Sequence, residues 1–118
     1  MIASARQALE MLVAEAGRIE REHGFGVDVR PAEDIALMHS ELSEALEELR
    51  NGHAPSETYF SKLDNVPTKP EGVPAELADV VIRILAFSSR HGIDLASAII
   101  HKMAFNETRP MRHGGKAL

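Results

Sequence analysis

The sequence predicts an all-α protein with four main helices in an antiparallel bundle that is completed by homo-oligomerisation. Apolar residues recur at helical spacing in four separate segments. Glycine, proline or a capping residue stands at most ends of these segments, where helices start or stop. Tryptophan is absent and aromatic residues make up only 4% of the chain, so aliphatic side chains must build the core. Such a composition favours helices over sheets.

The length of 118 residues fits one compact domain. We assign residues 1–109 to a single all-α domain and residues 110–118 to a basic, flexible C-terminal tail. The net charge of −5 disfavours a nucleic acid polymer as partner, because such a partner needs a basic surface. The absence of cysteine excludes disulfides and fits a cytoplasmic location. There is no signal-peptide pattern and no run of ~20 apolar residues, so no membrane partner is expected.

The first helix is expected to follow an N-cap at Ser4 and to end near Glu22, before a glycine-containing segment. Residues 25–30 form a connector, and Pro31 marks the start of a second helix over about residues 32–50. The apolar stripe of this second helix consists of Ile35, Met38, Leu42, Ala45, Leu46 and Leu49.

Residues 53–73 contain Pro55, Pro67, Pro70 and Gly72, which argue against a long helix. We expect a long loop with a short helix near residues 57–63, attached to the core by Tyr59, Phe60 and Leu63. A loop of this length in a small domain is often functional.

The third helix is expected over residues 74–90, and its apolar face is wide enough to indicate packing between two chains. Asp94 is expected to cap a fourth helix over residues 95–107. On this fourth helix Ile99 and Met103 are expected to face the core, whereas Lys102 and Asn106 share another side.

Two pairs of carboxylates stand out beside the apolar stripes. Glu41 and Glu44 on the second helix, and Glu76 and Asp79 on the third, are each spaced i, i+3 and so lie on one helix face. Solvated acidic faces are common in helices, and that is the ordinary reading of either pair alone. Opposed faces, however, would bring four carboxylates together, and their repulsion would require shared protons or a cation. Mg2+, which prefers oxygen ligands, fits best, with Mn2+ as an alternative.

The order Glu41-x-x-Glu44 followed by Glu76-x-x-Asp79 resembles the ExxE…ExxD signature of the MazG-like, all-α nucleoside triphosphate pyrophosphohydrolases. The segment Lys102-x-x-x-Asn106 is also similar to the second half of that family, and the match covers about residues 35–109. The 31 residues between Glu44 and Glu76 exceed the usual gap in the family, and we expect this difference to alter substrate choice.

This resemblance implies hydrolysis of an NTP or dNTP between the α and β phosphates, in housecleaning of the nucleotide pool. It implies Mg2+ held by Glu41, Glu44, Glu76 and Asp79, with Glu41 or Glu44 as the general base for a water molecule. Further substrate contacts are expected from Lys102, Asn106, Arg109 and Arg83, although Arg83 is equally suited to pair with Asp79.

Two alternatives stay open at this stage. One is an enzyme like phosphoribosyl-ATP pyrophosphohydrolase, and the other is a non-catalytic helical module for dimerisation or regulation. The base, the sugar, the number of metal ions and the choice between homodimer and homotetramer are also left open. Arg30 is a further candidate to close over a nucleotide, and Glu48 a further candidate ligand one turn beyond Glu44.

Overall fold

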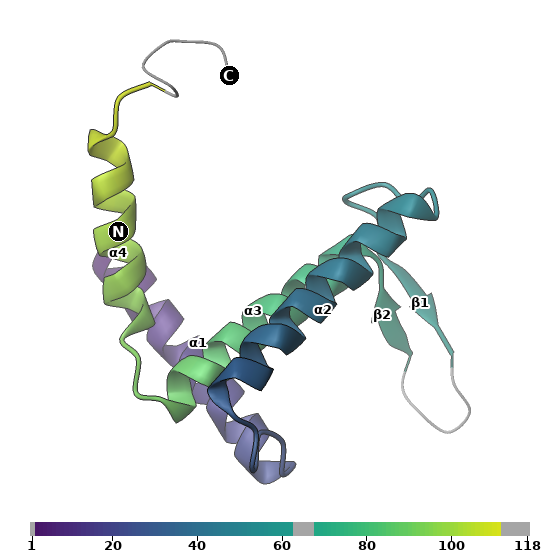
Figure 1. The fold of residues 1–118 in the computed structure, drawn as a ribbon, viewed down its shortest axis with the longest axis horizontal. Coiled ribbons are helices and arrows are strands. Elements are labelled where there is room, and N and C mark those ends of the chain that lie inside the picture. The colour runs from purple at the N-terminus through teal and green to yellow at the C-terminus, as the bar shows by residue number, and fades with distance from the viewer. Residues whose placement is uncertain (1, 63–67, 112–118) are drawn as a thin grey trace.

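The structure, a computed structural model, describes residues 2–62 and 68–111. It is mostly helical, as predicted, with a small two-stranded sheet between the second and third helices (Figure 1). Its elements are α1 (Ile2–Glu22), α2 (Pro31–Arg50), β1 (Tyr59–Ser61), β2 (Lys69–Glu71), α3 (Val73–Arg90) and α4 (Leu95–Thr108). Residues 112–118 of the predicted tail lie outside the described residues.

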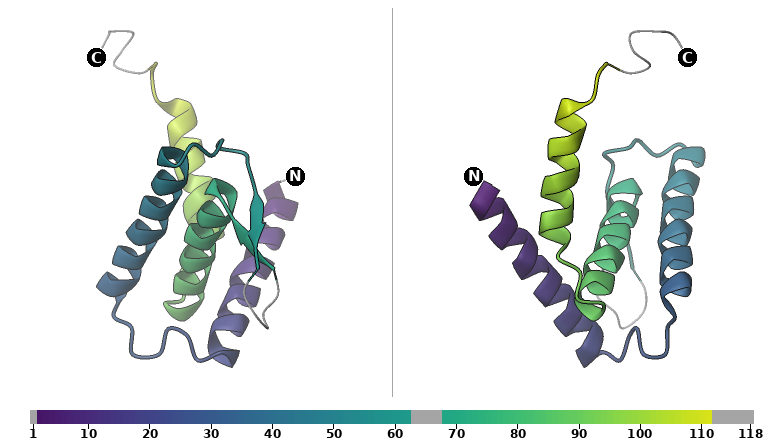
Figure 2. Two further views of the ribbon diagram at one scale, coloured as in Figure 1. Left: turned by 90° about the vertical axis from the view of Figure 1, so that its right-hand side faces the viewer. Right: turned by 60° about the vertical axis from the view of Figure 1, so that its left-hand side comes forward.

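The helices form two antiparallel pairs. α2 packs along α3, α4 packs on α1, and α1 also packs against α3 (Figures 1 and 2). The two pairs diverge from the region where α1 meets α3, so the described part of one chain does not close into a four-helix bundle. The short α3–α4 connection therefore directs α4 away from α2 and α3.

Local signals explain most of the helix boundaries. Pro31 and Pro74 lie in the first turns of α2 and α3, where a missing backbone N–H carries no penalty. Asp94 is the N-cap of α4, as predicted, because its side chain accepts a hydrogen bond of 3.0 Å from the backbone N–H of Ser97. The predicted cap at Ser4 is wrong, since α1 already begins at Ile2 and Ser4 lies inside the helix.

The predicted short helix near residues 57–63 is replaced by a β-hairpin. β1 pairs with β2 in antiparallel register, with Tyr59 opposite Glu71 and Ser61 opposite Lys69. Tyrosine and phenylalanine favour strands, and the nearby prolines disfavour helix, so the pairing of two short segments prevails. Phe60 is 62% exposed and does not attach the hairpin to the core, while Leu63 lies outside the described residues.

The side chain of one arginine joins three helices. Arg90 of α3 pairs with Glu20 of α1 and with Asp34 of α2, with N–O distances of 2.5 Å in both cases. Asp34 is only 6% exposed, so the charge of Arg90 compensates a buried carboxylate. Close by, Gly17 of α1 faces Ser89 of α3 so closely that a Cβ atom would collide with the serine side chain.

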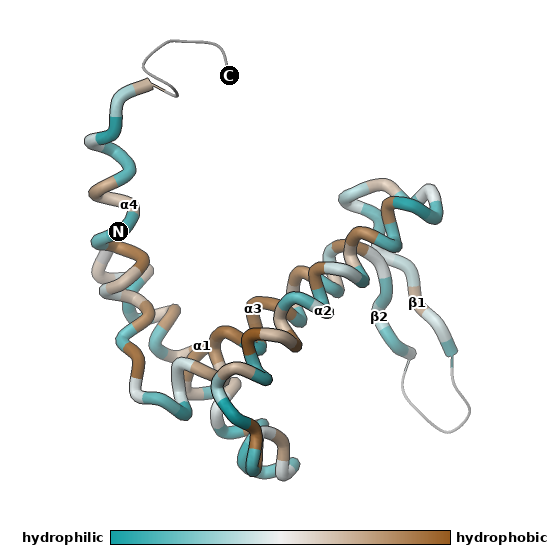
Figure 3. Tube along the Cα trace, viewed as in Figure 1, coloured by the Kyte–Doolittle hydropathy of each residue, from teal (hydrophilic) through white to brown (hydrophobic). Residues whose placement is uncertain are grey.

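The core of the single chain is small. The buried apolar residues of the described part are Ala45, Val73, Leu85, Ala86 and Ala96. Leu46 of α2 and Met103 of α4, which were expected to face the core, are 50% and 64% exposed, so that part of the prediction is wrong for one chain. Hydrophobic residues run along α3 (Figure 3), and three of them, Leu77, Val81 and Ile82, are 47%, 50% and 52% exposed. These side chains are exposed because the two helix pairs diverge.

The accessible surface is 9019 Å², whereas a compact monomer of this mass exposes roughly 6300 Å².

No helix in the described ranges is both long and apolar enough to span a bilayer.

Candidate metal centre

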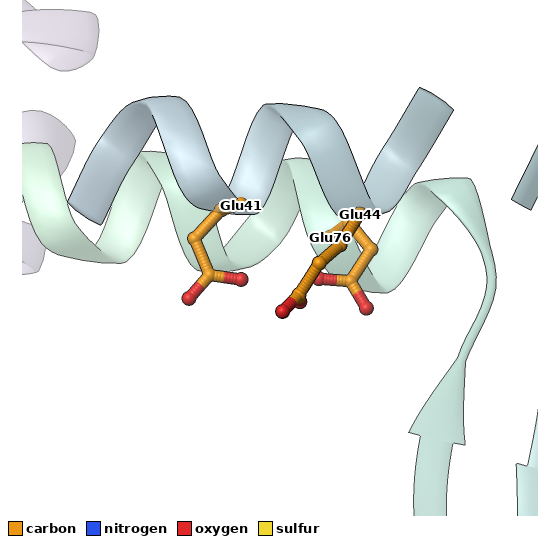
Figure 4. Close-up of side chains that lie close together, drawn as sticks. All are labelled: Glu41, Glu44 and Glu76. Carbon is orange, nitrogen blue, oxygen red and sulfur yellow. The ribbon is translucent and has the colours of Figure 1, made fainter. Parts of the chain in front are cut away.

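Three carboxylates meet between α2 and α3. Glu41 and Glu44 project from α2 and Glu76 projects from the first turn of α3, and one oxygen of each lies within 4.8 Å of the others (Figure 4). The i, i+3 spacing places the two α2 groups on one face, and the antiparallel packing of α3 brings Glu76 opposite them. The sequence thus predicted three members of this cluster, and all three lie together.

Of the three clustered carboxyl groups, Glu76 is the one whose negative charge is disfavoured by its surroundings. Burial, followed by the neighbouring carboxyl groups of Glu44 and Glu41, raises the pKa of Glu76 to about 8. In the metal-free protein Glu76 therefore holds a proton at neutral pH. Its Oε2 atom is buried and has no hydrogen-bond partner among the described residues. A buried oxygen that no donor of the described residues reaches, beside two further carboxyl groups, needs either a proton shared within the cluster or a hard divalent cation.

Asp79, the fourth predicted ligand, lies one turn further along α3 and outside the group of three oxygens that approach within 4.8 Å. Its pKa is raised by burial first and then by the charge of Glu41, while the charges of Arg83 and Lys69 lower it. Asp79 therefore shares the electrostatic field of the cluster and stands at its edge.

Arg83 is paired with a predicted ligand. Its Nη2 atom lies 3.0 Å from Oε1 of Glu41, and its Nε donates to the same oxygen at 3.1 Å. Pairing with Asp79, the alternative predicted from the sequence, is not the contact that forms. Glu41 is only 13% exposed at its side chain, so the guanidinium compensates a largely desolvated charge.

A cavity of about 490 Å³ adjoins the cluster on the side of α1. Glu41, Asp79 and Arg83 line it where it meets the carboxylates. Its walls are mostly apolar and come from α1, the connector, α2 and α3; they include Ala16, Ile19, Phe25, Val29, Leu37, Ile82 and Ala86. The cavity follows from the relative positions of the helices, which no local pattern in the sequence encodes.

The remaining predicted substrate contacts do not reach the cluster within one chain. Lys102, Asn106 and Arg109 lie on or directly after α4, which packs on α1, and all three are exposed. The ammonium group of Lys102 lies 5.4 Å from the ring centre of Phe105. Arg30 pairs with Glu33 at 2.8 Å at the start of α2.

Glu48 supports the hairpin. Both of its carboxylate oxygens accept the hydroxyl proton of Tyr59, at 2.9 and 3.0 Å. The ring of His53 stacks on Tyr59 with 4.5 Å between ring centres, and its Nε2 lies 3.6 Å from Glu48. These contacts occupy Glu48, so it does not join the three clustered carboxylates.

Sequence reasoning missed Lys69. This lysine lies on β2, and its charge acts on Glu44, Glu76 and Asp79. No pattern in the sequence indicated Lys69, because residues 53–73 were predicted to be a loop. The groups near Lys69 follow only from the pairing of β1 with β2.

Comparisons of the chain with protein-family models, with curated proteins and with solved structures find no match. The resemblance to MazG-like enzymes therefore stays a prediction that rests on the residues quoted for it.

Proposed function

We propose that this chain is a cytoplasmic, Mg2+-dependent nucleotide pyrophosphohydrolase that converts an NTP or dNTP to the monophosphate and pyrophosphate. The observation that carries the proposal is the meeting of Glu41, Glu44 and Glu76, which bring one oxygen each to within 4.8 Å of the others, while Oε2 of Glu76 is buried and receives no hydrogen bond from a donor of the described residues. A helix pair that only had to be stable would gain little from opposing these groups, since burial and then the neighbouring carboxyl groups raise the pKa of Glu76 to about 8.

Glu41, Glu44 and Glu76 would hold the metal, with Asp79 at the edge of the same field. A bound Mg2+ supplies charge neutralisation for the phosphate oxygens and a lower pKa for a coordinated water. Glu76 must release its proton before it can bind a cation, because a protonated carboxyl group is a poor ligand.

Glu44 is the better candidate for the general base. Glu41 is held by Arg83, whereas Glu44 is exposed and forms no ion pair with the described residues. In hydrolysis the water oxygen bonds to the α-phosphorus as its proton passes to Glu44. The bond from the α-phosphorus to the bridging oxygen breaks, and that oxygen leaves on pyrophosphate.

The cavity beside the cluster would receive the nucleoside. Its apolar walls suit the face of a base. Glu41, Asp79 and Arg83 line it next to the clustered carboxylates, and Glu20 and Asp34, which pair with Arg90, also belong to its lining. Its volume of about 490 Å³ accommodates a nucleoside. Arg83, next to the clustered carboxylates, is placed to exchange its contact with Glu41 for a phosphate oxygen.

A second copy of the chain would complete the assembly. Leu46, Val81 and Met103 are each at least half exposed on three different helices, and the surface of one chain is large for its mass. We propose that copies pack through these faces as a homodimer or homotetramer. Such packing is also the route by which Lys102 and Asn106 would reach a nucleotide, since α4 of the same chain points away from the cluster.

The experiment is release of pyrophosphate from a panel of NTPs, dNTPs and phosphoribosyl-ATP, with and without Mg2+. We compare wild type with Glu41→Gln and Asp79→Asn, and use Glu47→Gln as control because Glu47 is exposed and paired with Arg50 on α2. Mg2+-dependent release that both site variants lose and the control keeps would support the proposal. No release from any substrate by folded wild-type protein would contradict it and leave the non-catalytic helical module.

A further inference from the structure

We propose that Lys69 of the hairpin binds the β and γ phosphates of the nucleotide, the part of the substrate that leaves as pyrophosphate. The inference rests on the proposed function and adds a direction to it: the nucleoside lies toward α1 and the pyrophosphate toward the hairpin.

The order of groups along the helix pair carries this direction. The cavity meets the cluster at Glu41 and Asp79 and does not extend to Glu44 or Glu76. Glu44 lies one turn nearer the C-terminal end of α2, and Glu76 lies in the first turn of α3, which directly follows β2. With increasing distance from α1, the cavity therefore comes first. Glu41 and Asp79 come next, then Glu44 and Glu76, and finally the hairpin.

The hairpin projects on the side toward which the carboxylates point. In Figure 4 the side chains of Glu41, Glu44 and Glu76 point to one side of α2 and α3. The strand that leads into α3 extends on that same side. β2 packs against α3. A triphosphate that extends from the cavity across the carboxylates would therefore arrive at β2.

Lys69 is the cation of β2 that is electrostatically linked to this region. Its charge acts on Glu44 and Glu76 and lowers the pKa of Asp79. Its Nζ lies 3.3 Å from Oε1 of Glu71, and its side chain is 63% exposed, so it is free to turn toward a more highly charged anion. A triphosphate carries its greatest charge at the β and γ phosphates, which matches this position.

The hairpin that carries Lys69 contacts both helices that carry the carboxylates. Tyr59 of β1 donates to Glu48 of α2 at 2.9 and 3.0 Å, and β2 packs against α3. These contacts hold the hairpin beside the helix pair, and the exposed lysine side chain can turn on it.

Lys62 provides the matched control. It carries the same charge and is exposed, but it follows β1, whereas Lys69 lies on β2, the strand that packs against α3. We would measure binding of inorganic pyrophosphate and of a nucleoside monophosphate by calorimetry in Mg2+, for wild type, Lys69→Gln, Lys69→Arg and Lys62→Gln.

We expect Lys69→Gln to weaken pyrophosphate binding about tenfold, the loss of one charge-assisted contact, and to leave monophosphate binding within about twofold of wild type. Lys69→Arg retains the charge and is expected to keep most of the affinity for pyrophosphate, while Lys62→Gln keeps it entirely. Equal pyrophosphate affinity in Lys69→Gln and Lys62→Gln would overturn the role of Lys69 alone. Failure of wild type to bind either ligand in Mg2+ would overturn the proposed function together with this inference.

Discussion

Arg83 of α3 holds Glu41 of α2 through two nitrogens, Nη2 at 3.0 Å and Nε at 3.1 Å from the same carboxylate oxygen. This contact lies between the apolar cavity and the three clustered carboxylates. It partly neutralises the cluster. A cation that bound Glu41, as proposed above, would have to compete with the Arg83 guanidinium.

Replacement of Arg83 by glutamine is expected to lower the metal-free melting temperature by about 4–8 °C, the effect of about 1 kcal/mol in a small domain. The reason is that Glu41 loses its partner while it stays near other carboxylates. The rise in melting temperature on addition of Mg2+ is expected to be larger than in wild type, because the competing charge is gone. Arg50→Gln serves as control, since the Arg50–Glu47 pair is exposed. A smaller response to Mg2+ in Arg83→Gln would show that Arg83 does not compete for the site.

The raised pKa of Glu76 predicts how stability depends on pH without metal. Because the pKa of Glu76 is about 8 in the folded protein and 4.5 in the reference state, the folded chain binds this proton more tightly than the unfolded chain. The free energy of unfolding therefore decreases as pH rises from about 4.5 to about 8. We would measure urea unfolding at several pH values in the presence of a chelator.

Glu76→Gln removes this titration, so its stability should exceed that of wild type near the upper end of the range and depend less on pH. Glu47→Gln, at an exposed position of α2, should follow wild type. Parallel pH profiles for wild type and Glu76→Gln would contradict the assignment of the raised pKa to Glu76.

Metal binding is expected to release a proton at neutral pH. A cation that binds Glu76 must displace its proton, so the affinity for Mg2+ or Mn2+ should increase up to about pH 8. Calorimetric titration in two buffers of different ionisation enthalpy measures the protons released. Release of close to one proton in wild type and of none in Glu76→Gln is expected, and equal release in both would place the proton elsewhere.

Gly72, between β2 and α3, is expected to be essential for the position of the hairpin. Its φ of 109° favours glycine, and an added Cβ would collide with the backbone carbonyl of Glu57. Gly72→Ala should therefore destabilise the protein by about 2–4 kcal/mol, the combined effect of backbone strain and a steric clash. Gly52→Ala is the matched control, since Gly52 has a φ of 89° but no atom within 4 Å of an added Cβ.

Gly52→Ala should bear only the backbone strain, about 1 kcal/mol. Chemical denaturation measures both variants. A loss of stability no greater in Gly72→Ala than in Gly52→Ala would mean that the hairpin backbone shifts freely away from Glu57.

Association of the chain is expected to depend on the exposed apolar residues. Leu46→Glu places a charge on a side chain that is 50% exposed in one chain, so it should alter the folding of one chain little but weaken a dimer or tetramer. Ser40→Glu adds the same charge elsewhere on the exposed surface of α2 and is the control. Light scattering after size exclusion measures the mass. A wild-type mass of one chain, 12.9 kDa, would contradict the proposed assembly.

Short-range patterns were sufficient to predict much of the molecule. The extents of α2, α3 and α4 followed from apolar spacing with proline, glycine and Asp94 as boundary signals, because helix formation and capping involve residues only a few positions apart. The same spacing predicted that Glu41 and Glu44 share a face, and the helix predicted over residues 74–90 included Glu76, which lies opposite them. The cap at Ser4 was a local prediction that failed, since α1 extends two residues further toward the N-terminus.

The sequence by itself therefore determined four helices and two acidic faces, whereas the tertiary structure decided which groups meet. Only the packing of α2 on α3 shows that Arg83 pairs with Glu41 and that Asp79 stands at the edge of the cluster. Only the direction of α4 shows that Lys102 is remote from the carboxylates of its own chain, and only strand pairing places Lys69 on the hairpin that precedes α3, where its charge acts on Glu44 and Glu76. The physical reason is that contacts between elements depend on the relative rotation, register and direction of those elements. These quantities are set by the packing of many side chains far apart in sequence, and no local spacing encodes them.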